Sequence, residues 1–348
     1  MEQIPPDLDG VGARRRATIA EIARAADVSR QTVSNVLNAP QRVREETRRR
    51  VEQVIADTGY RPLKSAQSLR TRRSNLLAVG FQSPGAEPSP VLDVFLHALS
   101  TSARTLGYQI LLLTAGSDGA EIEAYTEAVV DYAVDGIVLT GTHTHDERIG
   151  WLRRQQLPFV TFGRPWGALG GHSWVDVDGA AGTRAATEHL ATAGHTRIAF
   201  LGWPAGSGSG DDRLQGWEQA CGRAGLPTRG LLRRCANTIE DGRKTCAAVL
   251  DQPRPPTAIV CVSDALAVGA WLEMRDRGLV PGRDVALIGF DDSTTASVIG
   301  LSSVAQPLPA VADACLDALR GQLGPGGPST DRWRQVLLQP ELVLRESG

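Results

Sequence analysis

Apolar residues at helical spacing predict two short helices joined by a tight turn over residues 18–38. The inward-facing residues of the first helix are Ile19, Ile22, Ala23 and Ala26, and those of the second are Val33, Val36 and Leu37. Ser29 is suited to cap the second helix, because its hydroxyl accepts from a free backbone N–H. A third helix is predicted over 45–58 and ends at Gly59.

From Asn75 onward, short apolar runs alternate with amphipathic segments. The first series predicts strands over 76–81, 109–114, 136–140 and 159–162, and helices over 91–106, 121–132 and 146–156. The second predicts helices over 179–193, 211–224, 242–250 and 265–277, and strands over 197–201, 258–262 and 285–290. This rhythm predicts two doubly wound, parallel-sheet subdomains. A ligand cleft is expected between them, at the carboxyl ends of the strands.

Composition fits a chain of two or three structural units, since 348 residues with 42% hydrophobic content allow a sizeable core. No apolar run reaches the ~18–20 residues of a membrane span, so no membrane partner is predicted. The N-terminal MEQIPPDLDG lacks the apolar stretch of a secretory signal, and five cysteines without paired spacing are typical of a reduced protein. We therefore expect a cytoplasmic location.

The net charge of −2 hides an asymmetry. Residues 1–73 carry 15 Lys and Arg against 9 Asp and Glu, a balance of +6, whereas the rest carries 22 against 30, a balance of −8. A basic N-terminal segment beside the two-helix motif indicates binding to a polyanion.

The exposed face of the second helix carries side chains that suit the major groove of DNA. Arg30 can pair with guanine, and Gln31 or Asn35 with adenine. The alternative is a solvated helical hairpin with no ligand. Residues 63–70 are too short to hold a helix in water alone, and Leu69 lies among arginines. Either this segment wedges Leu69 into the minor groove, or it is a basic interdomain linker.

No catalytic constellation, metal cluster or cofactor motif stands out, so we predict that the chain is not an enzyme and has no cofactor. The glycine-rich residues 206–210 lack the Lys-Ser/Thr of a phosphate-binding loop. His143 and His145 favour a solvated loop over a zinc site. The pair Asp291 and Asp292 follows a strand and favours a structural or ligand-contacting role.

From about Thr18 to its end, the chain resembles the LacI/GalR family of bacterial transcription repressors. Besides residues 18–38, the motifs that carry the resemblance are Glu45-Glu46-Thr47-Arg48, Gly59-Tyr60-Arg61-Pro62, Ser68-Leu69-Arg70, Val134-Asp135-Gly136-Ile137, Gly194-His195-Thr196-Arg197-Ile198-Ala199, Ser263-Asp264-Ala265-Leu266-Ala267-Val268-Gly269, Gly289-Phe290-Asp291-Asp292 and Pro340-Glu341-Leu342. The match is collinear and nearly full-length.

The resemblance implies an all-α helix-turn-helix headpiece over 18–62, after a disordered basic arm over 1–17. A hinge helix and linker would follow over 63–74. The α/β core over 75–348 would have two doubly wound subdomains like those of periplasmic sugar-binding proteins. We expect the first at about 75–176 and 304–327, and the second at about 177–303 and 328–348.

The resemblance also implies that a homodimer binds near-palindromic double-stranded operator DNA. Arg30, Gln31 and Asn35 would read bases, whereas Ser29, Thr32 and Ser34 would contact phosphates and pack the helix. Leu69 would intercalate in the minor groove between its neighbours Ala66 and Arg70. The complete set of expected DNA contacts is Thr18, Ser29, Arg30, Gln31, Thr32, Ser34, Asn35, Ala66, Leu69 and Arg70.

For the effector, Arg213 matches the family's ligand-binding arginine and Asp264 its hydroxyl-binding carboxylate. The full expected set is Thr142, Arg164, Ser209, Arg213, Asn237, Asp264 and Asp292. Two aromatic positions of the family are replaced here, one by Val91-Leu92 and one near Asn237, so stacking would fall to Trp166, Trp203 or Trp174.

We predict a sequence-specific repressor controlled by a small-molecule effector, first of all a sugar. The alternatives are a corepressor-type regulator that senses a nucleoside or another metabolite, and a solute-binding protein. The basic N-terminal unit argues against the last.

Overall fold

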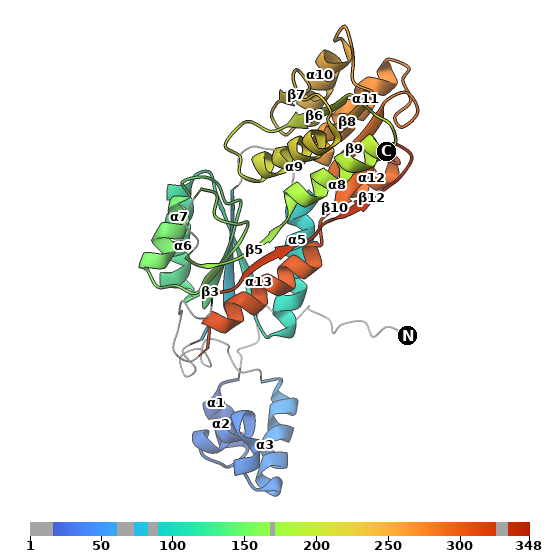
Figure 1. Cartoon of the computed structure of the whole chain (residues 1–348). Coiled ribbons are helices and arrows are strands. Elements are labelled where there is room, and N and C mark those ends of the chain that lie inside the picture. The colour runs from blue at the N-terminus through green and yellow to red at the C-terminus, as the bar shows by residue number, and fades with distance from the viewer. Residues whose placement is uncertain (1–16, 61–72, 83–89, 168–170, 325–332) are drawn as a thin grey trace, which may run out of the picture. The chain divides into compact units, whose positions relative to one another are not determined.

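The computed structural model describes residues 17–60, 73–82, 90–167, 171–324 and 333–348. The chain divides into two compact units between Ser74 and Asn75, as Figure 1 shows by colour along the chain. The hinge residues Ala66, Leu69 and Arg70 and most of the arm lie outside the described residues. In the described part, no helix is both long and apolar enough to cross a membrane.

The N-terminal unit is the expected headpiece of three helices, α1 (Ile19–Ala25), α2 (Arg30–Asn38) and α3 (Glu45–Thr58), with a 3-10 turn at Pro40–Arg42. Ser29 caps α2, since the backbone N–H of Thr32 donates to its Oγ at 3.0 Å. Gly59 ends α3 with a left-handed φ of 62°. The helices bury one small cluster centred on Ile22, Val33 and Val51.

The first subdomain of the core is a parallel sheet in the order β11-β5-β4-β3-β1-β2. Its strands are β1 (Leu76–Gln82), β2 (Gln109–Ala115), β3 (Gly136–Thr140), β4 (Phe159–Phe162), β5 (Ser173–Val177) and β11 (Gln335–Leu338). Its helices are α5 (Pro90–Thr105), α6 (Asp118–Asp131), α7 (Glu147–Arg154) and α13 (Leu308–Gln322).

Helices cover both faces of this sheet, α5 and α13 one face and α6 and α7 the other (Figure 1). Alternation along β1 explains the division: Leu77 and Val79 join the cluster beneath α5 and α13, whereas Ala78 joins the one beneath α6 and α7. The strand ends therefore stay open for a ligand.

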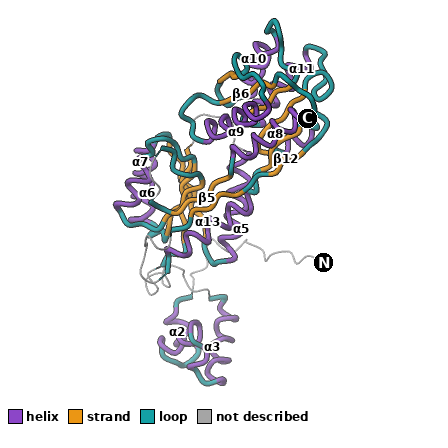
Figure 2. The backbone as a smooth tube through the Cα atoms, viewed as in Figure 1, coloured by secondary structure: helices purple, strands orange, loops and turns teal. Residues whose placement is uncertain are grey.

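The second subdomain has the sheet order β12-β10-β9-β8-β6-β7, with the edge strand β12 antiparallel to β10. Its strands are β6 (Ile198–Gly202), β7 (Leu232–Arg234), β8 (Ala258–Cys261), β9 (Ala286–Asp291), β10 (Ser302–Ala305) and β12 (Glu341–Val343). Its helices are α8 (Gly179–Thr192), α9 (Ser209–Ala224), α10 (Ile239–Leu250), α11 (Asp264–Asp276) and α12 (Thr294–Val298). Figure 2 draws helices in purple and labels α8, α9, α10 and α11 among these.

The chain passes between the sheets after β5, after β10 and between β11 and β12. The first passage lies where we expected it, and the second comes a few residues later, since β10 continues to Ala305 in the second sheet. The expectation that 328–348 belongs wholly to the second subdomain was wrong. β11 pairs with β5 of the first sheet, with Leu337 opposite Asp176. Only pairing across the sheet decides where so short an edge strand belongs.

Candidate functional site

The predicted base-reading residues lie together on the exposed side of α2. Arg30 and Gln31 are exposed at its N-terminal end, and the Gln31 amide donates to Asn35 Oδ1 at 3.1 Å. One turn later, the Asn38 amide donates to the Ser34 carbonyl at 2.7 Å. A positive charge and two carboxamides on one helix face can form bidentate hydrogen bonds with base edges.

The other predicted headpiece contacts serve the ends of helices. Thr18 forms a capping box with Glu21, whose carboxylate accepts from the Thr18 backbone N–H at 2.7 Å. Ser29 and Thr32 share a hydroxyl hydrogen bond of 2.8 Å at the start of α2. These residues fix the helix termini, which are also where phosphate groups bind to helices.

The main candidate ligand site is a cavity of about 290 Å³ between the two subdomains of the core. Four of the seven predicted effector residues line it, namely Thr142, Ser209, Arg213 and Asn237. Val91 and Leu92 also line it, as do Trp166 and Trp203 from the two subdomains; Trp174 does not. The cavity lies at the carboxyl ends of strands such as β3, β4, β5 and β9, where the sequence predicted a cleft, and its binding of an effector stays a prediction.

Arg213 is the central polar group of this cavity. Its guanidinium donates to the Val262 carbonyl at 2.6 Å and forms an ion pair of 3.5 Å with Asp291. It stacks over Phe290 at 3.7 Å and over Trp203 at 5.3 Å. Burial lowers the pKa of Arg213 and raises the pKa of Asp291 to about 7, against the opposing charge of its partner. This leaves a desolvated Arg–Asp pair facing the ligand space.

Two predicted carboxylates do not line this cavity. Asp264 accepts from the Ser303 hydroxyl at 2.6 Å and from the Ser293 backbone N–H at 2.7 Å, and it lies beside a neighbouring cavity. Asp292 forms an ion pair with Arg345 at 2.7 Å. Asp291 takes the place in the main cavity that we expected for them. The sequence indicated the carboxylate pair but not which member faces the ligand.

Arg164 is also absent from the cavity lining, because it lies behind two carboxylates. It forms ion pairs with Asp176 of β5 at 2.6 Å and with Asp212 of α9 at 3.3 Å, and so joins the two subdomains. Trp166 also crosses the cleft, since its ring occupies the space that a Cβ at Gly208 would need. Sequence reasoning missed Asp176, Asp212 and Gln306 as lining residues, and no local motif marks them.

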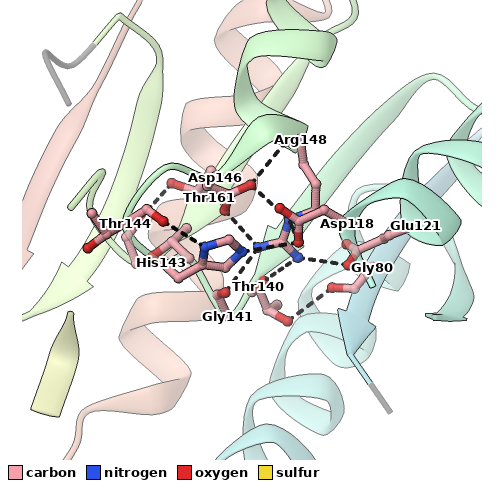
Figure 3. A network of polar contacts seen from close by, with 12 residues as sticks. Gly80, Asp118, Glu121, Thr140, Gly141, His143, Thr144, Asp146, Arg148 and Thr161 are labelled. Atoms are coloured by element: carbon pink, nitrogen blue, oxygen red, sulfur yellow. Dashed lines mark hydrogen bonds and ion pairs between the residues drawn. The ribbon is translucent and has the colours of Figure 1, made fainter. Parts of the chain in front are cut away.

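A polar network behind the cavity rim holds the turn after β3 (Figure 3). Fully buried Arg148 donates to the Gly141 carbonyl at 3.0 Å and pairs with Glu121 and Asp146, each at 2.7 Å. Gly141 lines the cavity, so Arg148 positions its rim.

His143, predicted to lie in a solvated loop, belongs to this network through Asp118 at 3.0 Å. Asp118, His143 and Asp146 have ligand atoms within 4.8 Å of one another, the spacing of a metal site. Each of them already has a partner, since Arg148 pairs with both Asp118 and Asp146, and His143 pairs with Asp118. The arrangement is a satisfied ion-pair network.

Comparisons with known families agree with both units. Residues 18–62 match the family described as "Bacterial regulatory proteins, lacI family", and residues 187–348 match a "Periplasmic binding protein-like domain". The chain is 33% identical over 343 residues to the HTH-type transcriptional regulator CelR of Thermobifida fusca, covering 96% of this chain and 99% of that protein.

Solved structures show the same fold. A transcriptional regulator CelR–cellobiose complex is 29% identical, with a TM-score of 0.72, and covers 96% of this chain and all of that one. A Lac repressor dimer bound to operator is 24% identical, with a TM-score of 0.84, and covers 96% and 99%. With a helix-turn-helix headpiece joined to this two-sheet core, the chain belongs to the LacI family of bacterial transcription regulators.

Proposed function

We propose that the protein is a transcription repressor that binds a near-palindromic operator as a homodimer and is controlled by a sugar. The observation that carries this proposal is one chain holding both the α2 face of Arg30, Gln31 and Asn35 and the cavity with the Arg213–Asp291 pair. The first suits base edges and the second suits a polyhydroxylated ligand, whose hydroxyls both donate and accept.

The sugar is supported by the composition of the cavity wall. Trp166, Trp203 and Phe290 offer flat apolar surfaces, and Ser209, Gln306 and Asn237 offer hydrogen bonds. The similar regulator CelR was solved in complex with cellobiose. A pyranose ring has the same combination of an apolar face and a rim of hydroxyls.

Control of DNA binding would operate by a shift of population. The Arg164–Asp212 ion pair and the Trp166–Gly208 contact join the subdomains in this conformation. A sugar that binds one arrangement of the subdomains more tightly than another shifts the balance between them. We propose that the hinge segment over 63–70 transmits this change to the headpieces.

Operator binding is tested by selecting duplexes from a random pool and measuring the affinity of the selected site. Gln31→Ala should weaken specific binding about 10- to 100-fold, because one bidentate base contact is lost, and leave binding to unrelated DNA unchanged. Gln53→Ala is the matched control, since Gln53 is an exposed glutamine of α3 that also bonds a residue four positions on. Failure to select any site would refute the repressor proposal.

A further inference from the structure

We infer that the effector is an uncharged polyhydroxylated ligand, and that sugar acids and sugar phosphates are excluded by the charge of the cavity. This rests on the proposed function, because it names the chemical class that the same cavity accepts. The argument uses the ionised groups around the cavity, the helix ends that meet it and its unpaired donors.

Each cationic side chain described at the cavity already forms an ion pair with a carboxylate of the protein, so none is left to pair with an anionic ligand. Of the described residues that line it, the ionisable ones are Asp176, Asp212, Asp291 and Arg213. Arg213 is paired with Asp291, and Arg164 behind the wall is paired with Asp176 and Asp212. When all five are ionised, which for Asp291 requires a pH above its pKa of about 7, three carboxylates face two guanidinium groups. An anionic ligand would add a second excess negative charge in a desolvated space.

Helix N-termini are the usual alternative for holding an anion, and at α8 a carboxylate of the chain itself takes this position. At the start of α8, the Ala180 backbone N–H donates to Asp212 at 3.0 Å. Before α9, the Gly206 backbone N–H donates to Asp211 at 2.6 Å. One backbone N–H of the glycine-rich turn over 206–210 is therefore already bonded to a carboxylate of the chain.

The remaining hydrogen-bonding groups of the cavity wall suit a ligand with hydroxyl groups. The carboxylates of the wall need donors, which an ionised phosphate or carboxylate group lacks and a hydroxyl supplies. Trp166 Nε1, Trp203 Nε1 and Arg213 Nε are buried N–H groups without a hydrogen-bond partner in the described structure. Each needs an acceptor, and a hydroxyl oxygen serves that need without bringing charge.

The test compares neutral sugars with their charged counterparts by isothermal titration of the full chain. The probes are glucose, galactose, maltose, cellobiose and melibiose, against their charged counterparts glucuronate, gluconate, glucose 6-phosphate, galacturonate, maltobionate, cellobionate and melibionate. We expect at least one neutral sugar to bind, and its charged counterparts to bind weaker by about tenfold or more. An anion that binds as tightly as its neutral counterpart would overturn the inference and leave the proposed function standing.

A charge variant tests the cause. Asp212→Asn removes one wall carboxylate and one partner of Arg164, so the neutral-to-anion affinity ratio should fall by about tenfold. The control is Asp276→Asn, which removes an exposed carboxylate of α11 that also pairs with an arginine but lies outside the cavity lining, and which should leave the ratio unchanged. An unchanged ratio in Asp212→Asn contradicts the electrostatic cause even if the variant binds weakly. Binding of no compound from either set refutes the sugar effector, whereas selection of an operator would still support DNA binding.

Discussion

For Asp291 and Asp292, a shift of one position along the chain decides whether the carboxylate faces the cavity. They are adjacent in sequence, yet Asp291 pairs with Arg213 in the cavity and Asp292 pairs with Arg345 away from it. β9 ends at Asp291, and both aspartates have positive φ values, 114° and 51°. Such angles are costly for residues other than glycine and are found where a site requires them. The turn therefore aims the two carboxylates in different directions.

This difference predicts that replacing aspartate by asparagine has different effects on sugar affinity at the two neighbouring positions. Asp291→Asn should weaken binding of the sugar that stabilises the wild type by roughly 10- to 100-fold, since a hydrogen bond to a charged group contributes ~1.5–3 kcal/mol. Asp292→Asn should change the affinity little. Titration calorimetry measures both, and a larger loss in Asp292→Asn would reverse our assignment of the ligand-facing carboxylate.

At the scale of an element, α7 depends on one buried cation. Arg148 is the side chain through which α7 contacts the carbonyl after β3 and the carboxylate of Glu121 on α6. Glu121 is itself fully buried and accepts from the Tyr125 hydroxyl. The amphipathic pattern predicted helix α7. The sequence does not indicate, however, that Arg148 on its inner face connects α7 with α6 and with the turn after β3.

Arg148→Met should destabilise the core by ~3–5 kcal/mol, because it leaves Glu121 and Asp146 buried without a cation. Arg154→Met is the matched control on the exposed side of α7 and should cost little. Urea unfolding followed by circular dichroism gives both values. Equal midpoints for the two variants would show that the network does not stabilise the core.

The same network predicts a dependence on pH. Burial lowers the pKa of His143, but hydrogen bonds to the Thr144 carbonyl and the Asp118 carboxylate outweigh it and raise the pKa above the ordinary 6.5. The folded state therefore binds the proton more tightly, and this stabilisation is present below pH 6.5 and lost as pH rises through the folded-state pKa. The stability lost in His143→Asn should be larger at pH 5.5 than at pH 8.5. A difference of the opposite sign in urea midpoints would contradict it.

At the scale of the whole molecule, regulation requires the headpiece and the core to act together. The headpiece has a small core of its own, whereas each sheet of the larger unit has an extensive one. Two headpieces that fold independently can bind one palindromic site tightly only when the dimer holds them at the right spacing. We therefore predict that the residues between the units govern the affinity for the operator.

We expect Leu69→Ala to weaken operator binding much more than binding to unrelated DNA, because the predicted wedge acts only where a hinge segment meets its site. Fluorescence anisotropy with the selected operator and with a scrambled duplex measures both affinities. Loss of the same size on both duplexes would make Leu69 part of a basic linker with no wedge role.

The sequence by itself determined the headpiece, the alternating strands and helices of the core and the family, because these depend on local periodicity, caps and collinear motifs. Helix α3 and strands β3 and β4 have the bounds that the pattern predicted. Helix α13, the strands β5 and β10, the short edge strands, the sheet to which β11 belongs and the cavity members Asp176, Asp212 and Asp291 were decided only by the tertiary structure. They depend on pairing and charge contacts between residues far apart in the chain, and a single sequence carries no local signal of those contacts.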